Sequence, residues 1–296
     1  MSDSAHLLLG TILLRPYVFI FLLVFLAGAI AHIGPARTWL FLPLGYAIAW
    51  LSEFSSIHWG FPYGDYYYIP RTTDRELWIH GVPFMDSLSY VFLSYCSYAT
   101  AVFLLSPLAM VRGRLLILET KRLRRSLEVW LLGAFLFVLL DIIIDPVALQ
   151  GDRWFLGQIY AYRVSGIYFG VPLSNFAGWL FVGFVLVGML QVLSRFHVLE
   201  PSQCSVLRRL PGVGVLGPLL YLSVLVFNLT VTFSIGETFM GVVGCFIVFY
   251  PLLLSCLVTR SKLRNPSSAA LERHLEDFPT ARCLLAGDPE GTGQDS

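Results

Sequence analysis

The sequence predicts an all-α membrane protein, a helical bundle of about seven transmembrane helices. Only 13% of its 296 residues are charged and 56% are hydrophobic, whereas soluble domains carry about 25% charged residues. The mean hydropathy of +0.72 points the same way. Seven separate stretches approach the roughly 20 apolar residues that a helix needs to cross the hydrocarbon core. We therefore expect the chain to be embedded in lipid.

The expected spans follow one another along most of the chain. They are Tyr17–Ile33, Trp39–Ile57, Val82–Val111, Leu127–Ile144, Pro172–Leu193, Val215–Ser234 and Phe239–Thr259. The first could be mistaken for a secretory signal peptide, but it lacks a basic n-region and a clear cleavage site, and a second span follows almost at once. We therefore expect it to be a membrane helix.

The basic residues predict the orientation of the bundle. Short cytoplasmic loops carry an excess of Lys and Arg. If seven spans alternate, one side of the membrane receives Arg37, Arg112, Arg114, Lys121, Arg122, Arg124, Arg125, Arg195, Arg208, Arg209, Arg260, Lys262 and Arg264, and the other only Arg15, Arg71, Arg75, Arg153 and Arg163. The N-terminus is therefore expected outside and the C-terminus in the cytoplasm.

A change in composition divides the chain into two parts. Residues 1–264 form the predicted transmembrane helical domain. Residues 265–296 are rich in Pro, Gly, Ser and charge without a sustained period, which is typical of a disordered cytoplasmic tail or a short surface helix. We expect this tail to have no role in an active site.

The composition also excludes several kinds of site. The formal net charge of +1 gives no global electrostatic reason to bind nucleic acid. The five cysteines have no C-x-x-C spacing and the six histidines form no pair at metal-ligand spacing, so no metal site is predicted. The sequence has none of the Gly-rich nucleotide motifs, and we expect no cofactor.

Ionisable residues inside the spans need an explanation, because each costs about 2.5–3.5 kcal/mol on insertion scales. Glu53 and Asp141 each lie fourteen residues into a span that runs outward, which places them about 21 Å into a hydrocarbon core about 30 Å thick. Asp145 follows Asp141 by one helical turn. Asp86 and Asn175 lie near the start of spans that descend from the outer surface. The outer third of the bundle is thus predicted to hold four carboxyls and an amide.

Two loops rich in aromatic residues, glycine and proline lie above this polar layer. The first is Trp59–Tyr68, and the second runs from Asp145 to Trp179. Irregular backbone is tolerated at the membrane surface where it lines a cavity. We therefore expect the loops Phe61–Tyr68 and Trp154–Phe169 to roof a single cavity with carboxyls at its wall. An aromatic girdle at the lipid–water boundary is the simpler alternative.

Each polar residue also has a purely structural interpretation. Asp145 precedes a proline and could be a surface residue at a helix end. Glu53 could form an ion pair with Arg163 or with another arginine of the outer loops. Asp86 lies near the outer surface, where solvation is the favoured interpretation. Asn175 could satisfy loop backbone groups or hydrogen-bond a carboxyl.

Four blocks of residues carry a family resemblance. They are Glu53 with Gly60–Tyr66 and Tyr68, then Gly81–Pro83, then Asp141 with Asp145–Ala148, and finally Tyr168–Leu173 with Asn175, Phe176, Gly178 and Trp179. Between about Trp39 and Gly183 the chain resembles the membrane-embedded carotenoid biosynthesis family, in particular its carotenoid 1,2-hydratases, which include γ-carotene 1',2'-hydratases and bisanhydrobacterioruberin hydratases. It differs from the family pattern at Asp86, Tyr90 and Tyr160–Arg163, and these differences bear on the substrate.

The resemblance implies addition of water to the terminal 1,2 double bond of an acyclic carotenoid ψ-end, giving a tertiary alcohol without a cofactor. The partners would be an acyclic or monocyclic carotenoid, water and membrane lipid, and the location a bacterial cell membrane. Protonating a trisubstituted alkene creates a tertiary cation. Such a site therefore needs a protonated acid in a dry pocket, π-faces or a carboxylate to stabilise the cation, and a positioned water.

Residues of the chain can be matched to these needs. Asp141 and Asp145 are the expected proton donors, because a carboxyl beside a second carboxyl in low-dielectric surroundings can stay protonated near neutral pH. Glu53 and then Asp65 are the next candidates. The residues expected to bind substrate are Tyr66, Trp154, Tyr168 and Trp179, whose rings could also stabilise the cation, and Asn175, in a supporting role.

Two other functions fit parts of the pattern. Asp141-x-x-x-Asp145 matches half of the aspartate-rich motif of a prenyltransferase, but the sequence lacks the second acidic cluster that would hold a diphosphate through magnesium. A non-enzymatic isoprenoid transporter or lipid-binding protein could use the same polar layer. The sequence shows no inverted repeat and no polar path into the cytoplasmic half, which disfavours transport.

Overall fold

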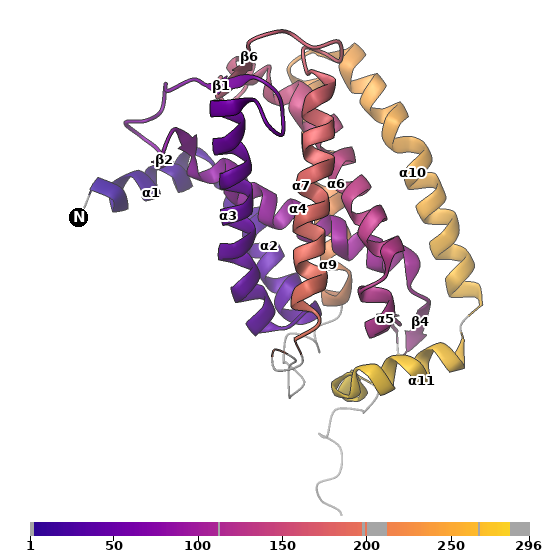
Figure 1. Ribbon diagram of the computed structural model, residues 1–296. Coiled ribbons are helices and arrows are strands. Elements are labelled where there is room, and N and C mark those ends of the chain that lie inside the picture. Colours follow the sequence, from indigo (N-terminus) through magenta and orange to yellow (C-terminus); the bar gives the residue numbers. More distant parts are fainter. Residues whose placement is uncertain (1–2, 112, 197–198, 200–211, 266, 285–296) are drawn as a thin grey trace, which may run out of the picture.

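Long helices make up most of the structure. The computed structural model describes residues 3–111, 113–196, 199, 212–265 and 267–284. Figure 1 shows its longer helices side by side in one bundle, except for α1, which projects from the side. These helices are α1 (Asp3–Leu14), α2 (Pro16–His32), α3 (Pro35–Trp59), α4 (Phe84–Leu105), α6 (Leu127–Ala148), α7 (Leu173–Leu193), α9 (Leu216–Ser234) and α10 (Thr238–Arg264). The all-α fold class is confirmed.

The number of membrane spans agrees with the sequence. Six helices are long and apolar enough to cross a membrane alone, namely α3, α4, α6, α7, α10 and the helix Val213–Ser234 that contains α9. The pair α1 and α2 passes the same test only when taken together, with a bend of 90° between the two helices, so the described residues hold six candidate spans, or seven if this pair is one span. The orientation across the membrane stays a prediction. Arg112, Arg208 and Arg209, which contribute to it, lie outside the described residues.

The bend between α1 and α2 follows from an Arg-Pro step. Pro16 is the first residue of α2, and the residue before a proline is pushed out of the helical region. Arg15 accordingly has φ −125° and ψ 49°. Its guanidinium is buried and pairs with Glu76 of the outer loop, with Nε–Oε2 and Nη2–Oε1 distances of 3.2 Å each. This ion pair fixes the bend to the loop that follows α3.

The third predicted span is shorter than the sequence indicated. The expected helix Val82–Val111 becomes α4, while Val82–Pro83 forms strand β3, paired with β2 (Trp78–Ile79). At the other end Ser106 is extended because a proline follows it. The chain then turns into a hairpin of β4 (Leu108–Val111) and β5 (Arg114–Ile117). The prediction overran the helix because the hairpin strand is as apolar as the helix before it.

Helix α4 lies at the centre of the bundle. It packs against α2, α3, α6, α7 and α9. Of the residues in its most apolar stretch, 78% are buried inside the bundle. Small residues on α4, among them the buried Ser87, Ser94 and Ser97, permit this close approach. Packing of small residues associates helices in lipid, where the hydrophobic effect between helices is lost. Any polar group in the first turn of α4 therefore lies inside the bundle.

A small sheet covers the end of the bundle at which α3 and α6 finish. Strand β1 (Tyr66–Tyr68) pairs antiparallel with β6 (Tyr160–Tyr162), with Tyr66 opposite Tyr162 and Tyr68 opposite Tyr160. Alternate residues of a strand point to the same face, so these four tyrosines share one face of the sheet. The two loops that the sequence placed above the polar layer are thus joined by backbone hydrogen bonds.

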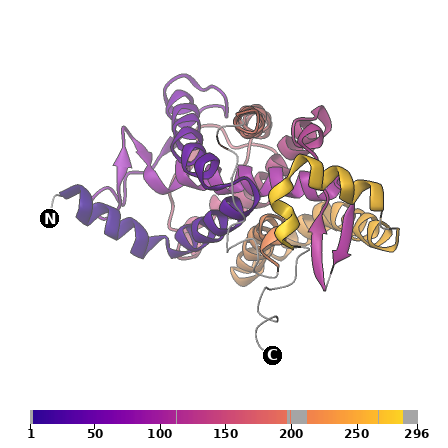
Figure 2. The same cartoon turned by 90° about the horizontal axis from the view of Figure 1, so that it is seen from below.

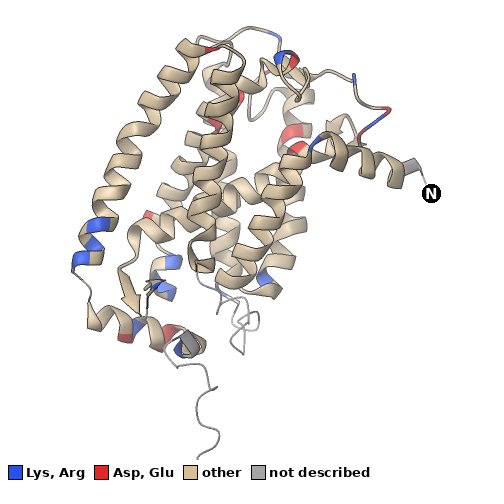
Figure 3. Ribbon diagram, turned by 180° about the vertical axis from the view of Figure 1, so that it is seen from behind, with Lys and Arg blue, Asp and Glu red and all other residues tan. Residues whose placement is uncertain are grey.

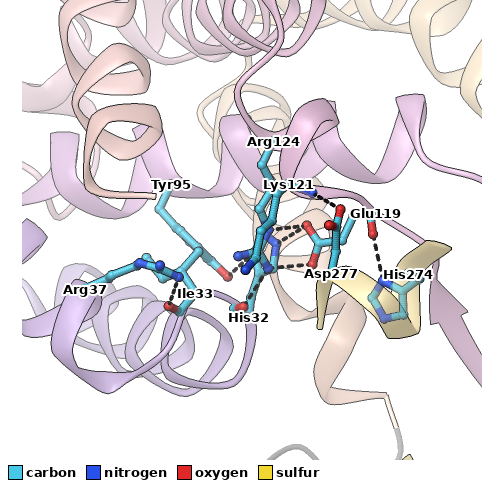
Figure 4. A network of polar contacts seen from close by, with 9 residues as sticks. All are labelled: His32, Ile33, Arg37, Tyr95, Glu119, Lys121, Arg124, His274 and Asp277. Atoms are coloured by element: carbon cyan, nitrogen blue, oxygen red, sulfur yellow. Dashed lines mark hydrogen bonds and ion pairs between the residues drawn. The ribbon is translucent and has the colours of Figure 1, made fainter. Parts of the chain in front are cut away.

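A buried ion-pair network joins the elements at the opposite end (Figure 4). Glu119 accepts hydrogen bonds of 2.6 Å from both Nε and Nη2 of Arg124 in α5 (Lys121–Arg124), and its Oε2 lies 3.2 Å from Nε2 of His32 in α2. Burial alone would raise the pKa of Glu119, but the Arg124 and His32 charges hold that pKa well below its ordinary value. The carboxylate is therefore fully compensated.

The segment after α10 closes this end. It contains α11 (Ser268–Asp277) and a 3₁₀ helix over Pro279–Leu284, and in Figure 2 α11 lies across the β4–β5 hairpin. Nδ1 of His274 lies 2.7 Å from the backbone oxygen of Glu119, and Asp277 accepts a 2.7 Å bond from the backbone N–H of Lys121. Of the two alternatives that the sequence left for this segment, residues 268–277 adopt the helix.

Candidate active site

Two carboxyls on α6 form the first half of the polar cluster. Asp141 and Asp145 lie one turn apart, both are buried, and both face the first turn of α7. There the Nδ2 atom of Asn175 donates to Asp141 Oδ2 and to Asp145 Oδ2, each at 2.8 Å. An amide NH₂ has two hydrogens, so this single side chain fixes the spacing of the two carboxyls.

The small sheet supplies two further donors to Asp145. The hydroxyl of Tyr160 lies 2.8 Å from Asp145 Oδ1, and that of Tyr162 lies 2.8 Å from Oδ2. Burial, together with the nearby charge of Asp145, raises the pKa of both phenols well above the ordinary value, so both phenols stay protonated. Asp145 is thus held by three side chains, whereas the buried Oδ1 of Asp141 has no hydrogen-bond partner among the described residues.

Glu53 on α3 and Asp86 on α4 form the second half. The hydroxyl of Tyr68 lies 2.6 Å from Asp86 Oδ2 and 3.1 Å from Glu53 Oε1, and Ser87 donates to the other oxygen of Glu53. Burial raises the pKa of Tyr68 well above its ordinary value, and the two carboxylate charges add to this. A phenol has only one hydrogen, so Glu53 and Asp86 share the one hydrogen of Tyr68.

Two adjoining cavities meet at this cluster. The polar cavity, about 40 Å³, is lined by Glu53, Tyr63, Tyr66, Tyr68, Asp86, Tyr90, Asp145, Tyr160, Tyr162, Asn175 and Trp179. The apolar cavity, about 110 Å³, lies between α2, α4, α6 and α9, and its wall includes Tyr17, Phe21, Phe92, Trp154 and Phe227. Asp86, Asp145, Tyr160 and Trp179 line both. A hydrocarbon and a water molecule could therefore occupy neighbouring spaces with the same carboxyls between them.

No basic side chain forms an ion pair with these four carboxyls within the described part of the chain. The nearby arginines are engaged elsewhere, Arg15 with Glu76 and Arg163 with Asp65. The sequence-based alternative of an ion pair between Glu53 and Arg163 is therefore wrong. Among the described residues, no group of His, Cys, Asp or Glu is arranged to hold a metal ion.

The predicted site residues divide into three sets. Glu53, Tyr66, Asn175, Trp179 and Asp145 line the polar cavity, and Trp154 lines the apolar one with its indole N–H fixed to the Val147 carbonyl at 3.1 Å. Asp141 is hydrogen-bonded to Asn175 and lines neither cavity. Asp65 and Tyr168 are not brought to the cluster, because Asp65 is 65% exposed in its ion pair and Tyr168 packs on Phe169 and Phe176.

Four members of the cluster were not among the predicted site residues. Asp86 was expected to be solvated, but it is half-buried and lines both cavities. Tyr68, Tyr160 and Tyr162 were not assigned to the carboxyls. The Tyr-x-Tyr pattern in both loops was the available signal, because it predicts two tyrosines on one face of each strand. The pairing of the two strands, however, could not be inferred from either segment alone.

Comparison with known proteins gives the family. The family described as carotenoid biosynthesis protein matches residues 4–251, which include every element that contributes to the two cavities. No curated protein and no solved structure matches the chain significantly. The match extends over most of the sequence and agrees with the resemblance found in the separate blocks. The chain therefore belongs to the carotenoid biosynthesis protein family.

Proposed function

We propose that this protein is a carotenoid 1,2-hydratase that adds water to the terminal double bond of an acyclic carotenoid end. The observation that carries the proposal is the shared wall of the two cavities, where Asp86 and Asp145 face an aromatic, apolar space on one side and a polar space on the other. Hydration of an alkene needs an acid beside a hydrocarbon and a water within reach of the same atoms. Membership of the carotenoid biosynthesis protein family supports a carotenoid as the substrate.

Asp145 is the proposed proton donor. Its carboxyl proton moves to the CH carbon of the isopropylidene bond, and the π electrons of that bond form the new C–H bond, leaving a tertiary cation on the dimethyl carbon. The donors Tyr160, Tyr162 and Asn175 then stabilise the Asp145 carboxylate that results. Asp141, bridged to Asp145 through the same amide, places a second carboxyl nearby, which favours the protonated form before reaction.

The ring of Trp179 is the proposed stabiliser of the cation. It lines both cavities and is stacked on Tyr90 at a centroid distance of 4.5 Å, with Phe137 at 4.7 Å. Rings packed in this way keep their orientation when substrate enters. A cation near an indole face gains about 0.5–2 kcal/mol, more when water is excluded. Trp154 supplies a second π-face in the apolar cavity.

The polar cavity is the proposed source of the water. Its volume of about 40 Å³ exceeds the roughly 10–15 Å³ that one water needs. The water oxygen bonds to the tertiary carbon, and its surplus proton passes to Asp86, whose carboxylate is positioned by Tyr68. Asp86 and Asp145 line the same cavity, so a further water can return that proton to Asp145. The net change is one water added to one double bond.

Expression in a lycopene-producing bacterial host tests the proposal. The expected result is a carotenoid that gains the mass of one water and carries a tertiary hydroxyl at the former double bond. The host with an empty vector is the control. A prenylated product would support a prenyltransferase, and unchanged lycopene, with the protein present in the membrane, would support a binding or transport protein. Either result would contradict the proposal.

A further inference from the structure

A third cavity, larger than the two at the candidate active site, lies in the other half of the bundle. Its volume is about 500 Å³, within the roughly 300–1,000 Å³ of small-molecule pockets. It is bounded by α4, α6, α9 and the second half of α10, and its wall is almost wholly apolar, for example at Phe103, Leu139, Leu222 and Leu252. Nothing in the proposed hydration uses it.

The position of α10 explains why this space exists. Figures 1 and 3 show α10 at the edge of the bundle. Glu237, just before its first residue, forms an ion pair with Arg153, and near its other end Lys262 Nζ donates to the backbone carbonyls of Ser106, at 2.8 Å, and Leu104. Pro251 lies within the helix between these anchors and lines the cavity. The helix is thus held at both ends and leaves a gap along its second half.

Two arginines near the C-terminal end of α10 line one end of this cavity. Arg260 and Arg264 are one turn apart on α10, both line the cavity and both are exposed. In Figure 3 the basic residues of α10 gather at this end of the helix. No acidic side chain pairs with either arginine among the described residues, in contrast to Arg15 and Arg124, which are buried against carboxylates. An apolar groove that ends at two uncompensated guanidinium groups matches an acyl chain that ends at a phosphate.

We propose that this groove binds one anionic phospholipid, with an acyl chain along α10 and the phosphate between Arg260 and Arg264. A carotenoid is the other hydrocarbon at hand, but it has no anionic group to meet the arginines. The groove also shares no lining residue with the two active-site cavities. Cys96 on α4 and Leu140 on α6 lie along their helices between the two sets of lining residues and are fully buried. The lipid site is therefore separate from the candidate active site.

Native mass spectrometry of the purified full-length protein in detergent tests the proposal. The probes are dioleoyl phosphatidylglycerol and dioleoyl phosphatidylcholine, which share acyl chains and differ in headgroup charge. We expect one tightly bound phosphatidylglycerol. Arg260→Gln and Arg264→Gln should each weaken its binding about fivefold, and the double variant about 30-fold, because one basic residue near an anionic headgroup contributes about that factor.

Two further variants keep the test decisive. Arg273→Gln removes an exposed arginine of α11 that is not part of the groove, and it should leave binding unchanged. Ser255→Phe places a ring inside the groove while keeping both arginines, and it should abolish binding. Equal binding of the two lipids, or an unchanged preference in the double variant, would overturn the proposal. So would displacement of the bound lipid by lycopene, which would make the groove a carotenoid site.

Discussion

Carboxyl groups are buried at both ends of the bundle, but their hydrogen-bonding and ion-pair partners differ. At one end Glu119 receives two hydrogen bonds from Arg124 and a contact from His32. At the other end Glu53, Asp86, Asp141 and Asp145 meet tyrosine hydroxyls, a serine and one amide, and no basic group among the described residues.

The difference separates a structural role from a chemical one. A buried carboxylate with a guanidinium partner is fixed in its charged form and cannot give up a proton. Carboxyls that share neutral donors can hold a proton and transfer it. The comparison fits a stabilising role for the Glu119 network and, under the proposed function, acid chemistry for the cluster around Asp145. Variants at the two ends should then have opposite effects on activity and on stability.

The largest effect on activity is expected from Asp145→Asn. Asparagine keeps the size and much of the hydrogen bonding of aspartate but cannot deliver a proton, so hydration should fall by about 10²–10⁴. Product formed per amount of membrane-inserted protein is the measurement. Asp152→Asn, the same change at an exposed position, is the control. Near-normal hydration by Asp145→Asn would exclude it as the essential acid and turn attention to Asp141 and Glu53.

The largest effect on stability is expected from Arg124→Gln. This change leaves Glu119 buried without its main partner, and breaking a buried ion pair costs about 3–5 kcal/mol. Thermal unfolding of the detergent-solubilised protein should shift strongly downward, while the folded fraction should retain its hydration rate. Arg125→Gln alters the neighbouring arginine, which is hydrogen-bonded to Ser194 instead, and should have a smaller effect. An inactive but fully stable Arg124→Gln protein would reverse the assignment of roles.

A smaller effect on activity is expected from Tyr160→Phe. The change removes one of three donors to Asp145 and leaves the ring in place, so hydration should slow by about tenfold, in line with the loss of one hydrogen bond to a charged group. Tyr67→Phe is the matched control, because Tyr67 lies on the other face of β1 and is exposed. Equal rates for the two variants would remove Tyr160 from the site.

The smallest effect is a pH dependence of stability at the Glu119 end. The pKa of Glu119 is lowered in the folded protein, so its stabilising contribution is present above the unfolded value of about 4.3 and is lost as the pH falls towards the folded value. Unfolding temperatures of the unmodified protein and of Glu119→Gln should therefore differ near neutral pH and begin to approach each other as the pH falls below about 4. A constant difference across this range would contradict the charge assignment.

The sequence predicted the spans well because they depend on composition over long windows. It predicted a common depth for Glu53 and Asp141 because helical rise is regular, and the structure brings both into one cluster. It overran α4, because an apolar hairpin strand cannot be distinguished from helix by hydropathy. It placed Asp86 in the polar layer but did not include it among the site residues, and it did not predict the contacts of Tyr68 and Tyr160, because these depend on the pairing of β1 with β6, a contact between segments far apart in the chain.

The most direct test of the central claim is isotope incorporation by the purified protein acting on lycopene in D₂O and, separately, in H₂¹⁸O. The account predicts that the product carries one deuterium on the carbon next to the tertiary centre and ¹⁸O in the new hydroxyl, and that Asp145→Asn incorporates neither above background. A product formed in D₂O without deuterium on that carbon would contradict proton transfer from the cluster between the two cavities. Equal labelling of the product by the Asp145→Asn protein would contradict it too.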